Sequence, residues 1–84
     1  MDKLINLKKK ILYRSNYRGT KEMDILLSSF VNFYIEKLNE KDLENLLELL
    51  NNEDEILYNF YRNIDSDKTL KNNKILQLFK DFKL

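Results

Sequence analysis

Apolar residues recur along this chain at the three- and four-residue spacing that is typical of amphipathic helices. The clearest run extends from about Thr20 to Leu38 and predicts one helix. Its apolar face is wider than a single stripe, which indicates a central helix contacted by several others. The residues of this face are Met23, Leu26, Leu27, Phe30, Tyr34 and Leu38, widened by Ile25, Val31 and Phe33.

Four more helices are predicted, over about residues 2–16, 40–50, 53–63 and 67–82, with turns rich in Asn, Asp and Ser between them. Asn39 is expected to cap the third helix. No strand-like alternation and no internal repeat is present. We therefore expect an all-α fold, a compact antiparallel bundle of about five short helices forming one domain, 1–84. The expected core positions in these helices are Leu4, Leu7, Ile11, Leu43, Leu46, Leu47, Leu50, Ile56, Leu57, Phe60, Ile64, Leu70, Ile75, Leu78, Phe79 and Phe82.

Composition narrows the possible functions. The chain has 84 residues with no cysteine and no histidine, so disulfides, the usual zinc sites and histidine acid–base catalysis are excluded. We therefore expect no enzyme, no catalytic residue, and no metal or stably bound cofactor. No apolar run approaches the ~20 residues that span a bilayer, and no signal peptide is evident. The simplest interpretation is a bacterial cytoplasmic protein without membrane insertion, although a processed organellar protein would look similar. We also expect a monomer.

Charge is unevenly distributed although the net charge is only +1. Residues 1–21 are basic, and residues 39–57 are acidic. Such a separation can orient a protein partner, or it can simply keep two helix surfaces solvated. The sequence leaves both interpretations open. The run Lys8-Lys9-Lys10 is interpreted as a solvated face.

The only glycine of the chain, Gly19, lies between the first two predicted helices. A lone glycine predicts a positive φ or a close neighbouring group, and it can end the first helix or cap the second. Arg18 beside it is expected to present its planar guanidinium to a carboxylate or an aromatic ring of a partner. The alternative is an arginine that neutralises Glu22 or Asp24 within the domain. If the arginine and its neighbouring acids were all turned inward, out of reach of any other molecule, recognition of a partner by this turn would be contradicted.

Two acids follow the glycine on the next helix. If Gly19 is the cap, Glu22 occupies the third helical position and can fold back onto the cap amide as half a capping box. Glu22→Ala would then cost ~1 kcal/mol of stability without a specific loss of function. Asp24 is expected to support the loop by anchoring Arg14 or Arg18.

The segment Arg18-Gly19-x-x-Glu22-x-Asp24, with the apolar helix after it, resembles the signature of the succinate dehydrogenase assembly factor family, the small flavinylation factors. The preceding Leu12-Tyr13-Arg14-Ser15 is similar to a segment of mitochondrial members. Downstream, Leu46-Leu47 and Asp54–Phe60 resemble two further family segments. Differences from the family pattern occur at Tyr17, Ile56 and Phe60. The resemblance covers about residues 10–64.

This resemblance implies an assembly factor, or dedicated chaperone, that binds the flavoprotein subunit of succinate dehydrogenase and, in some bacteria, of fumarate reductase. It promotes covalent attachment of FAD to a histidine of that subunit, so FAD is the group attached to the client. The implied partner-binding residues are Arg18, Gly19, Glu22, Asp24, Arg14 and Tyr13. Asp54, Tyr58 and Asn59 are a second candidate contact, unless they only cap and pack the fourth helix.

Two alternatives remain at this point. A small nucleic-acid-binding domain would use the basic first helix, although the near-neutral net charge and the acidic third helix argue against it. An antitoxin-like regulatory module is the other, and no residue supports it directly.

Overall fold

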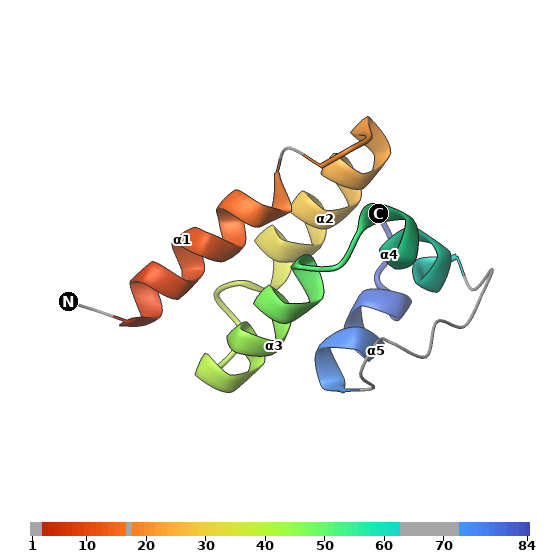
Figure 1. The fold of residues 1–84 in the computed structure, drawn as a ribbon. Coiled ribbons are helices and arrows are strands. Elements are labelled where there is room, and N and C mark those ends of the chain that lie inside the picture. Colours follow the sequence, from red (N-terminus) through yellow and green to blue (C-terminus); the bar gives the residue numbers. More distant parts are fainter. Residues whose placement is uncertain (1–2, 17, 63–72) are drawn as a thin grey trace.

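Five α-helices form the chain in the computed structural model, which describes residues 3–16, 18–62 and 73–84 (Figure 1). The helices are α1 (Lys3–Ser15), α2 (Lys21–Tyr34), α3 (Glu40–Leu50), α4 (Asp54–Tyr61) and α5 (Lys74–Asp81). Helices α1, α2 and α3 run antiparallel in succession, and no strand occurs in the described ranges (Figure 1). The predicted all-α class is confirmed. None of the described helices combines the length and the apolar character that crossing a bilayer requires.

Polar side chains fix where three of the helices begin. The side-chain oxygens of Thr20, Asn39 and Asn73 each accept a hydrogen bond from the backbone amide three residues later, at 3.2, 2.8 and 2.9 Å. Such caps satisfy one of the amides that a helix start leaves without a partner. The expected Asn39 cap is confirmed. Gly19 ends no helix, because α1 stops at Ser15 and Thr20 caps α2.

Two predicted helices are longer than those observed. Helix α2 ends at Tyr34, four residues early, where the amide of Lys37 donates to the Tyr34 carbonyl in a tighter turn. Helix α5 begins only at Lys74, because Asn73 has extended backbone angles and caps it. The predicted break at 65–67 and the expected core residues Ile64 and Leu70 lie outside the described residues.

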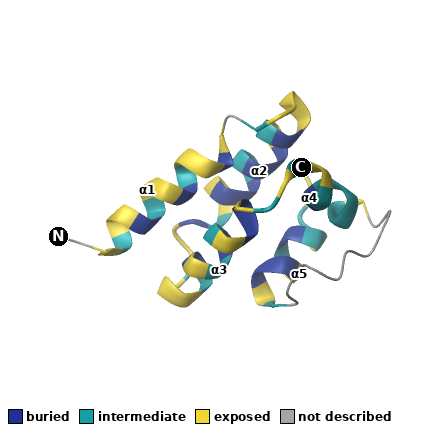
Figure 2. Cartoon of the chain, viewed as in Figure 1, coloured by how far each residue is buried: buried dark blue, intermediate teal, exposed yellow. Residues whose placement is uncertain are grey.

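The core lies between α2, α3 and α5, and α1 packs on both α2 and α3. Figure 2 shows the buried positions on the inward sides of these helices. Helix α2 contributes five buried side chains, and the ring of Phe30 lies 5.3 Å from that of Phe79 in α5. In α3, Leu49 is buried and Leu47 only half-buried, so the predicted face is rotated by part of a turn.

Candidate functional site

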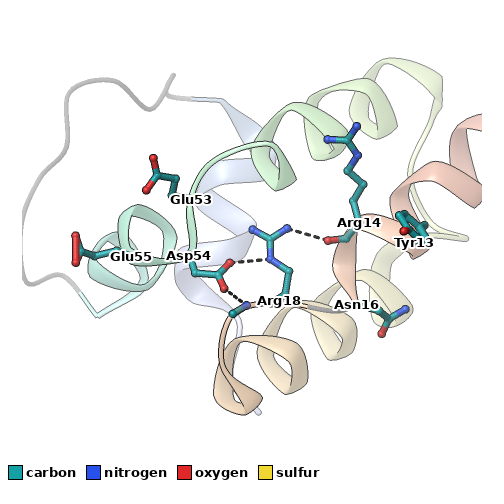
Figure 3. Close-up of a pocket in the computed structure, with 8 residues that line it drawn as sticks. Tyr13, Arg14, Asn16, Arg18, Glu53, Asp54 and Glu55 are labelled. Carbon is teal, nitrogen blue, oxygen red and sulfur yellow. Dashed lines mark hydrogen bonds and ion pairs between the residues drawn. The ribbon is translucent and has the colours of Figure 1, made fainter.

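The Arg18 side chain is turned into the molecule and is only 11% exposed. Its Nε donates to Asp54 Oδ1 at 2.7 Å, and its Nη2 donates to the Asn52 carbonyl at 3.0 Å. Its Nη1 donates to the carbonyls of Arg14 and Leu50, at 2.8 and 3.0 Å (Figure 3). Those two carbonyls belong to the last turns of α1 and α3, where helices leave carbonyls without donors and where a cation is favoured. One guanidinium therefore ties together two helix ends and the start of α4.

This orientation corrects both interpretations of Arg18. The guanidinium does not present its planar fork to a partner, and the acid that neutralises it is neither Glu22 nor Asp24. Its carboxylate partner is Asp54, 36 positions along the chain. The physical reason is that three carbonyls converge beside Asp54, and an arginine fork can satisfy all of them at once.

Glycine is needed at position 19 because the carboxylate of Asp54 approaches the backbone closely there, and not because of its backbone angles. Its amide donates to Asp54 Oδ2 at 2.6 Å, and a Cβ at this position would lie 3.1 Å from the same oxygen. The φ of Gly19 lies outside the left-handed region, so of the two alternatives predicted for this glycine, the close neighbouring group is the one that the structure confirms. Asp54 thus accepts from Arg18 with one oxygen and from Gly19 with the other. As the first residue of α4, it also lies at the positive end of that helix dipole. Asp54 does not cap α4, because the cap position is that of Glu53, whose side chain makes no capping hydrogen bond.

Asp24 holds the other side of this turn. Its Oδ1 accepts from the backbone amide of Arg18 at 2.5 Å, and the residue is half-buried. Asp24 therefore supports the loop as expected, through the main chain of Arg18 and not through a guanidinium. The carboxylates of Asp24 and Asp54, from different helices, thus accept hydrogen bonds from the consecutive backbone amides of Arg18 and Gly19. These two bonds fix the shape of the turn. We call Arg18, Gly19, Asp24 and Asp54 the clamp.

The Glu22 side chain is exposed to solvent. Because Thr20 is the cap, Glu22 occupies the second helical position, and the amide at the third, Met23, is bonded by the Thr20 hydroxyl. The capping-box interpretation is therefore wrong. In the part of the chain that the structure describes, the Glu22 carboxylate has no hydrogen bond or ion pair. The dipole of α2, which favours an acid in the first turn, is the contribution to stability that remains for this side chain.

Two shallow hollows lie on either side of the Gly19–Asp54 contact. The first, of about 540 Å³, is lined by Tyr13, Arg14, Asn16, Arg18, Gly19, Glu53, Asp54 and Glu55 (Figure 3). The second, of about 390 Å³, is lined by Gly19, Thr20, Glu22, Met23, Asp54, Glu55 and Tyr58. The candidate partner residues of α1 and α2 thus meet Asp54 and Tyr58 of the second candidate contact. Asn59 is half-buried and lines neither hollow.

Tyr13 and Arg14 are the residues of α1 that line the first hollow. Tyr13 is 70% exposed and is not part of the buried core. Arg14 is exposed and its Nη1 donates to Asn51 Oδ1 in the loop after α3. Sequence reasoning did not single out Glu53 and Glu55, although the run Glu53-Asp54-Glu55 at a helix start was a visible signal. Across the described ranges, no three acidic side chains gather as metal ligands.

Comparison with known proteins agrees with the resemblance carried by these residues. The family described as "flavinator of succinate dehydrogenase" matches residues 9–83. The mitochondrial succinate dehydrogenase assembly factor 2 of Saccharomyces cerevisiae is 37% identical over 78 residues, which cover 87% of this chain and 48% of that protein. Its counterpart in Dictyostelium discoideum is 43% identical over 54 residues, 64% of this chain and 38% of that protein.

The chain therefore spans about half, or less, of the length of these curated relatives. No solved structure shows a significant match to it. The family match nevertheless covers nearly all of the chain, including the clamp and both hollows. We conclude that this chain belongs to the family of flavinators of succinate dehydrogenase.

Proposed function

We propose that this protein is an assembly factor that binds the flavoprotein subunit of succinate dehydrogenase and promotes covalent FAD attachment to it. The observation that carries this proposal is the family match over residues 9–83, which contains every residue of the clamp. The names of the two relatives, both succinate dehydrogenase assembly factors, support the same activity.

The contact surface that we propose is the outer side of the clamp. Tyr13, Arg14, Gly19 and Glu22 are exposed there, and half-buried Tyr58 lines the adjoining hollow. The clamp residues Arg18, Asp24 and Asp54 act as positioning residues, because their side chains hold the turn from within. A surface fixed in advance loses less conformational entropy on binding than a flexible one, which favours recognition by a rigid turn.

The chain supplies no group to the bond that forms. It has no histidine, so the acceptor histidine belongs to the client, as does the flavin. We propose that docking favours the client conformation in which this histidine lies next to the flavin ring. An assembly factor has to leave its client, so a moderate and partly polar interface is expected. The mixed charged and aromatic lining of the two hollows suits such an interface.

A nucleic-acid-binding function is not favoured. Part of the basic charge of α1 is already paired, since Lys3 lies 3.1 Å from Glu40 and Lys8 lies 2.9 Å from Glu36. A nucleic-acid surface would leave these cations available to phosphates.

Covalent flavin in cells that lack this gene tests the proposal. Wild-type protein is expected to restore the in-gel fluorescence of the flavoprotein subunit, and Glu22→Ala is expected to restore much less while remaining folded. Glu36→Ala is the matched control, since it removes an exposed acid just beyond the far end of the same helix.

Equal flavinylation by the Glu22→Ala and control proteins would remove Glu22 from the contact surface. Normal flavinylation in cells without the gene would contradict the function itself. Circular dichroism of each purified variant separates a loss of contact from a loss of folding.

Several further parts of the proposal rest on the sequence. We propose a single-domain monomer that works in a bacterial cytoplasm, with fumarate reductase as a second client. Both relatives carry "mitochondrial" in their names, so they do not support a bacterial cytoplasmic location. Sedimentation of the purified chain tests the monomer, and flavinylation of the fumarate reductase subunit in the same deletion strain tests the second client.

A further inference from the structure

The cations of α1 fall into two groups that differ in how they are neutralised. Near its start, Lys3 pairs with Glu40 and Lys8 with Glu36. Further along, Lys9 and Lys10 are exposed, and no carboxylate of a described residue lies within ion-pair distance of either.

Arg14, one turn beyond, bonds the side chain of Asn51, which is a neutral amide. Glu44 lines another hollow together with Lys10, but its ion pair is with Lys3, at 3.7 Å. The second half of α1 therefore carries positive charge that no ion pair among the described residues neutralises. The dipole at a helix C-terminus favours Arg14 there, but Lys9 and Lys10 lie further from that end.

A hollow lies beside these unbalanced cations, where α1 packs on α3. It measures about 400 Å³ and is lined by Lys9, Lys10, Tyr13, Arg14, Leu47 and Asn51. Leu47 is half-buried and offers an apolar surface, while Tyr13 is largely exposed at the rim. Tyr13 and Arg14 also line the first hollow beside the clamp, so the α1–α3 hollow and the first hollow share these two lining residues.

We propose that this α1–α3 hollow is a second docking surface, which receives an acidic segment of the partner protein. Carboxylates of that segment lie against Lys9, Lys10 and Arg14, and an apolar side chain packs on Leu47. An arginine fork can bind a carboxylate bidentately, and the lysines act as point charges. The inference rests on the proposed function, because it takes the flavoprotein subunit as the partner that carries this segment.

Charge complementarity favours a short acidic segment of a protein over a nucleic acid. Acids flank the α1–α3 hollow on both sides: Glu40 and Glu36 pair with Lys3 and Lys8 in the first half of α1, and Glu53 and Glu55 lie beyond the clamp. A long polyanion that followed α1 would meet like charge at both ends. A segment with a few carboxylates meets only the cations between them. Contacts of this kind act mainly on the association rate, and salt weakens them.

The test measures binding of the purified flavoprotein subunit to the full chain at low and at high salt. Lys9→Glu/Lys10→Glu is expected to weaken binding at low salt by about tenfold or more and to flatten its salt dependence. The matched control is Lys41→Glu/Lys83→Glu, which makes the same change in net charge at exposed positions away from the hollow. It is expected to bind as the wild type does.

Each outcome separates the inference from the function on which it rests. If wild type binds and Lys9→Glu/Lys10→Glu binds equally well, the second surface is overturned and the proposed function stands. If the control weakens binding as much, net charge is the cause and the inference fails. If wild type does not bind the subunit at all, the proposed function fails first. Wild-type binding to duplex DNA that Lys9→Glu/Lys10→Glu abolishes would also overturn the acidic-segment assignment.

Discussion

Opposite charges meet at both ends of α1, but the two clusters are built differently. At its start, Lys3 lies 3.1 Å from Glu40 and 3.7 Å from Glu44, and its side chain is 74% exposed. Just beyond its end, Arg18 is 11% exposed and its guanidinium makes four hydrogen bonds, one of them to Asp54. Exposed pairs contribute little because water and salt screen them, whereas breaking a buried pair leaves a charge without compensation.

This difference indicates which end of α1 fixes the geometry of the candidate site. The clamp orders the turn between α1 and α2, and its exposed side carries Glu22 and Gly19. The Lys3 cluster can be altered without disturbing any side chain that lines the hollows beside the clamp. Four predictions follow the comparison from the buried cluster to the exposed one.

Removing the carboxylate of the clamp should have the largest effect. Asp54→Ala leaves Arg18 without its counter-ion and the Gly19 amide without its acceptor, so we expect a loss of about 3 kcal/mol in the free energy of unfolding. Urea denaturation followed by circular dichroism measures it. Glu55→Ala, an exposed neighbour in the same turn, should change stability by less than about 0.5 kcal/mol. Equal losses in the two variants would show that the clamp is not a stabilising unit.

Adding a methyl group at Gly19 should weaken its contact with Asp54 and reduce stability less than Asp54→Ala does. Its Cβ would lie 3.1 Å from Asp54 Oδ2, so the carboxylate has to shift, and we expect Gly19→Ala to lose about 1 kcal/mol. In an Asp54→Ala background the oxygen is gone, and the same substitution should become neutral or slightly stabilising. A double-mutant cycle of unfolding free energies measures this coupling, and additive effects would contradict the geometry.

The cap of α2 distinguishes two residues that the sequence did not separate. Thr20→Ala should cost about 1 kcal/mol, because the Met23 amide loses its acceptor. Glu22→Ala should change stability by less than about 0.5 kcal/mol. Thermal or urea unfolding of the pair checks this, and the reverse order would restore the capping-box interpretation.

Removing the charge of Lys3 from its exposed cluster with Glu40 and Glu44 should have the smallest effect on stability. The hydrogen bond that Lys3 donates to Glu40, together with the charges of Glu40 and Glu44, raises the pKa of Lys3 above its usual 10.5. A raised lysine pKa stabilises the fold below the unfolded value, and this contribution is lost as the pH rises through the folded value. Lys3→Gln should therefore leave the melting temperature nearly unchanged at pH 7, with any difference vanishing in strong alkali. A large loss at pH 7 would contradict the comparison.

Most helix positions and one cap followed from the sequence because they depend on neighbours. Apolar residues spaced by three and four predicted the positions of α1, α3 and α4 closely, and Asn39 was recognised as a cap from its place before an acidic first turn. The end of α2 was missed, since the apolar pattern continues to Leu38 after the backbone has already tightened at Tyr34. The start of α5 was missed because Asn73 was not recognised as a second asparagine cap.

The candidate site followed only in part. The sequence identified Arg18, Gly19, Glu22 and Asp24 as a unit, and Asp54 as a residue of interest. It did not indicate that Asp54 lies against Gly19, because 35 residues separate the two. The choice between an arginine that faces a partner and one that faces inward depended on that contact.

Local spacing in the chain by itself determined that it folds into helices, where most of them lie and which family motif it carries. These properties depend on residues a few positions apart, and such interactions are encoded directly in the order of amino acids. Tertiary structure alone decided that Arg18 points inward and Glu22 outward. Carbonyls from the ends of α1 and α3 and a carboxylate from α4 have to converge before a buried guanidinium becomes favourable, and only packing brings them together.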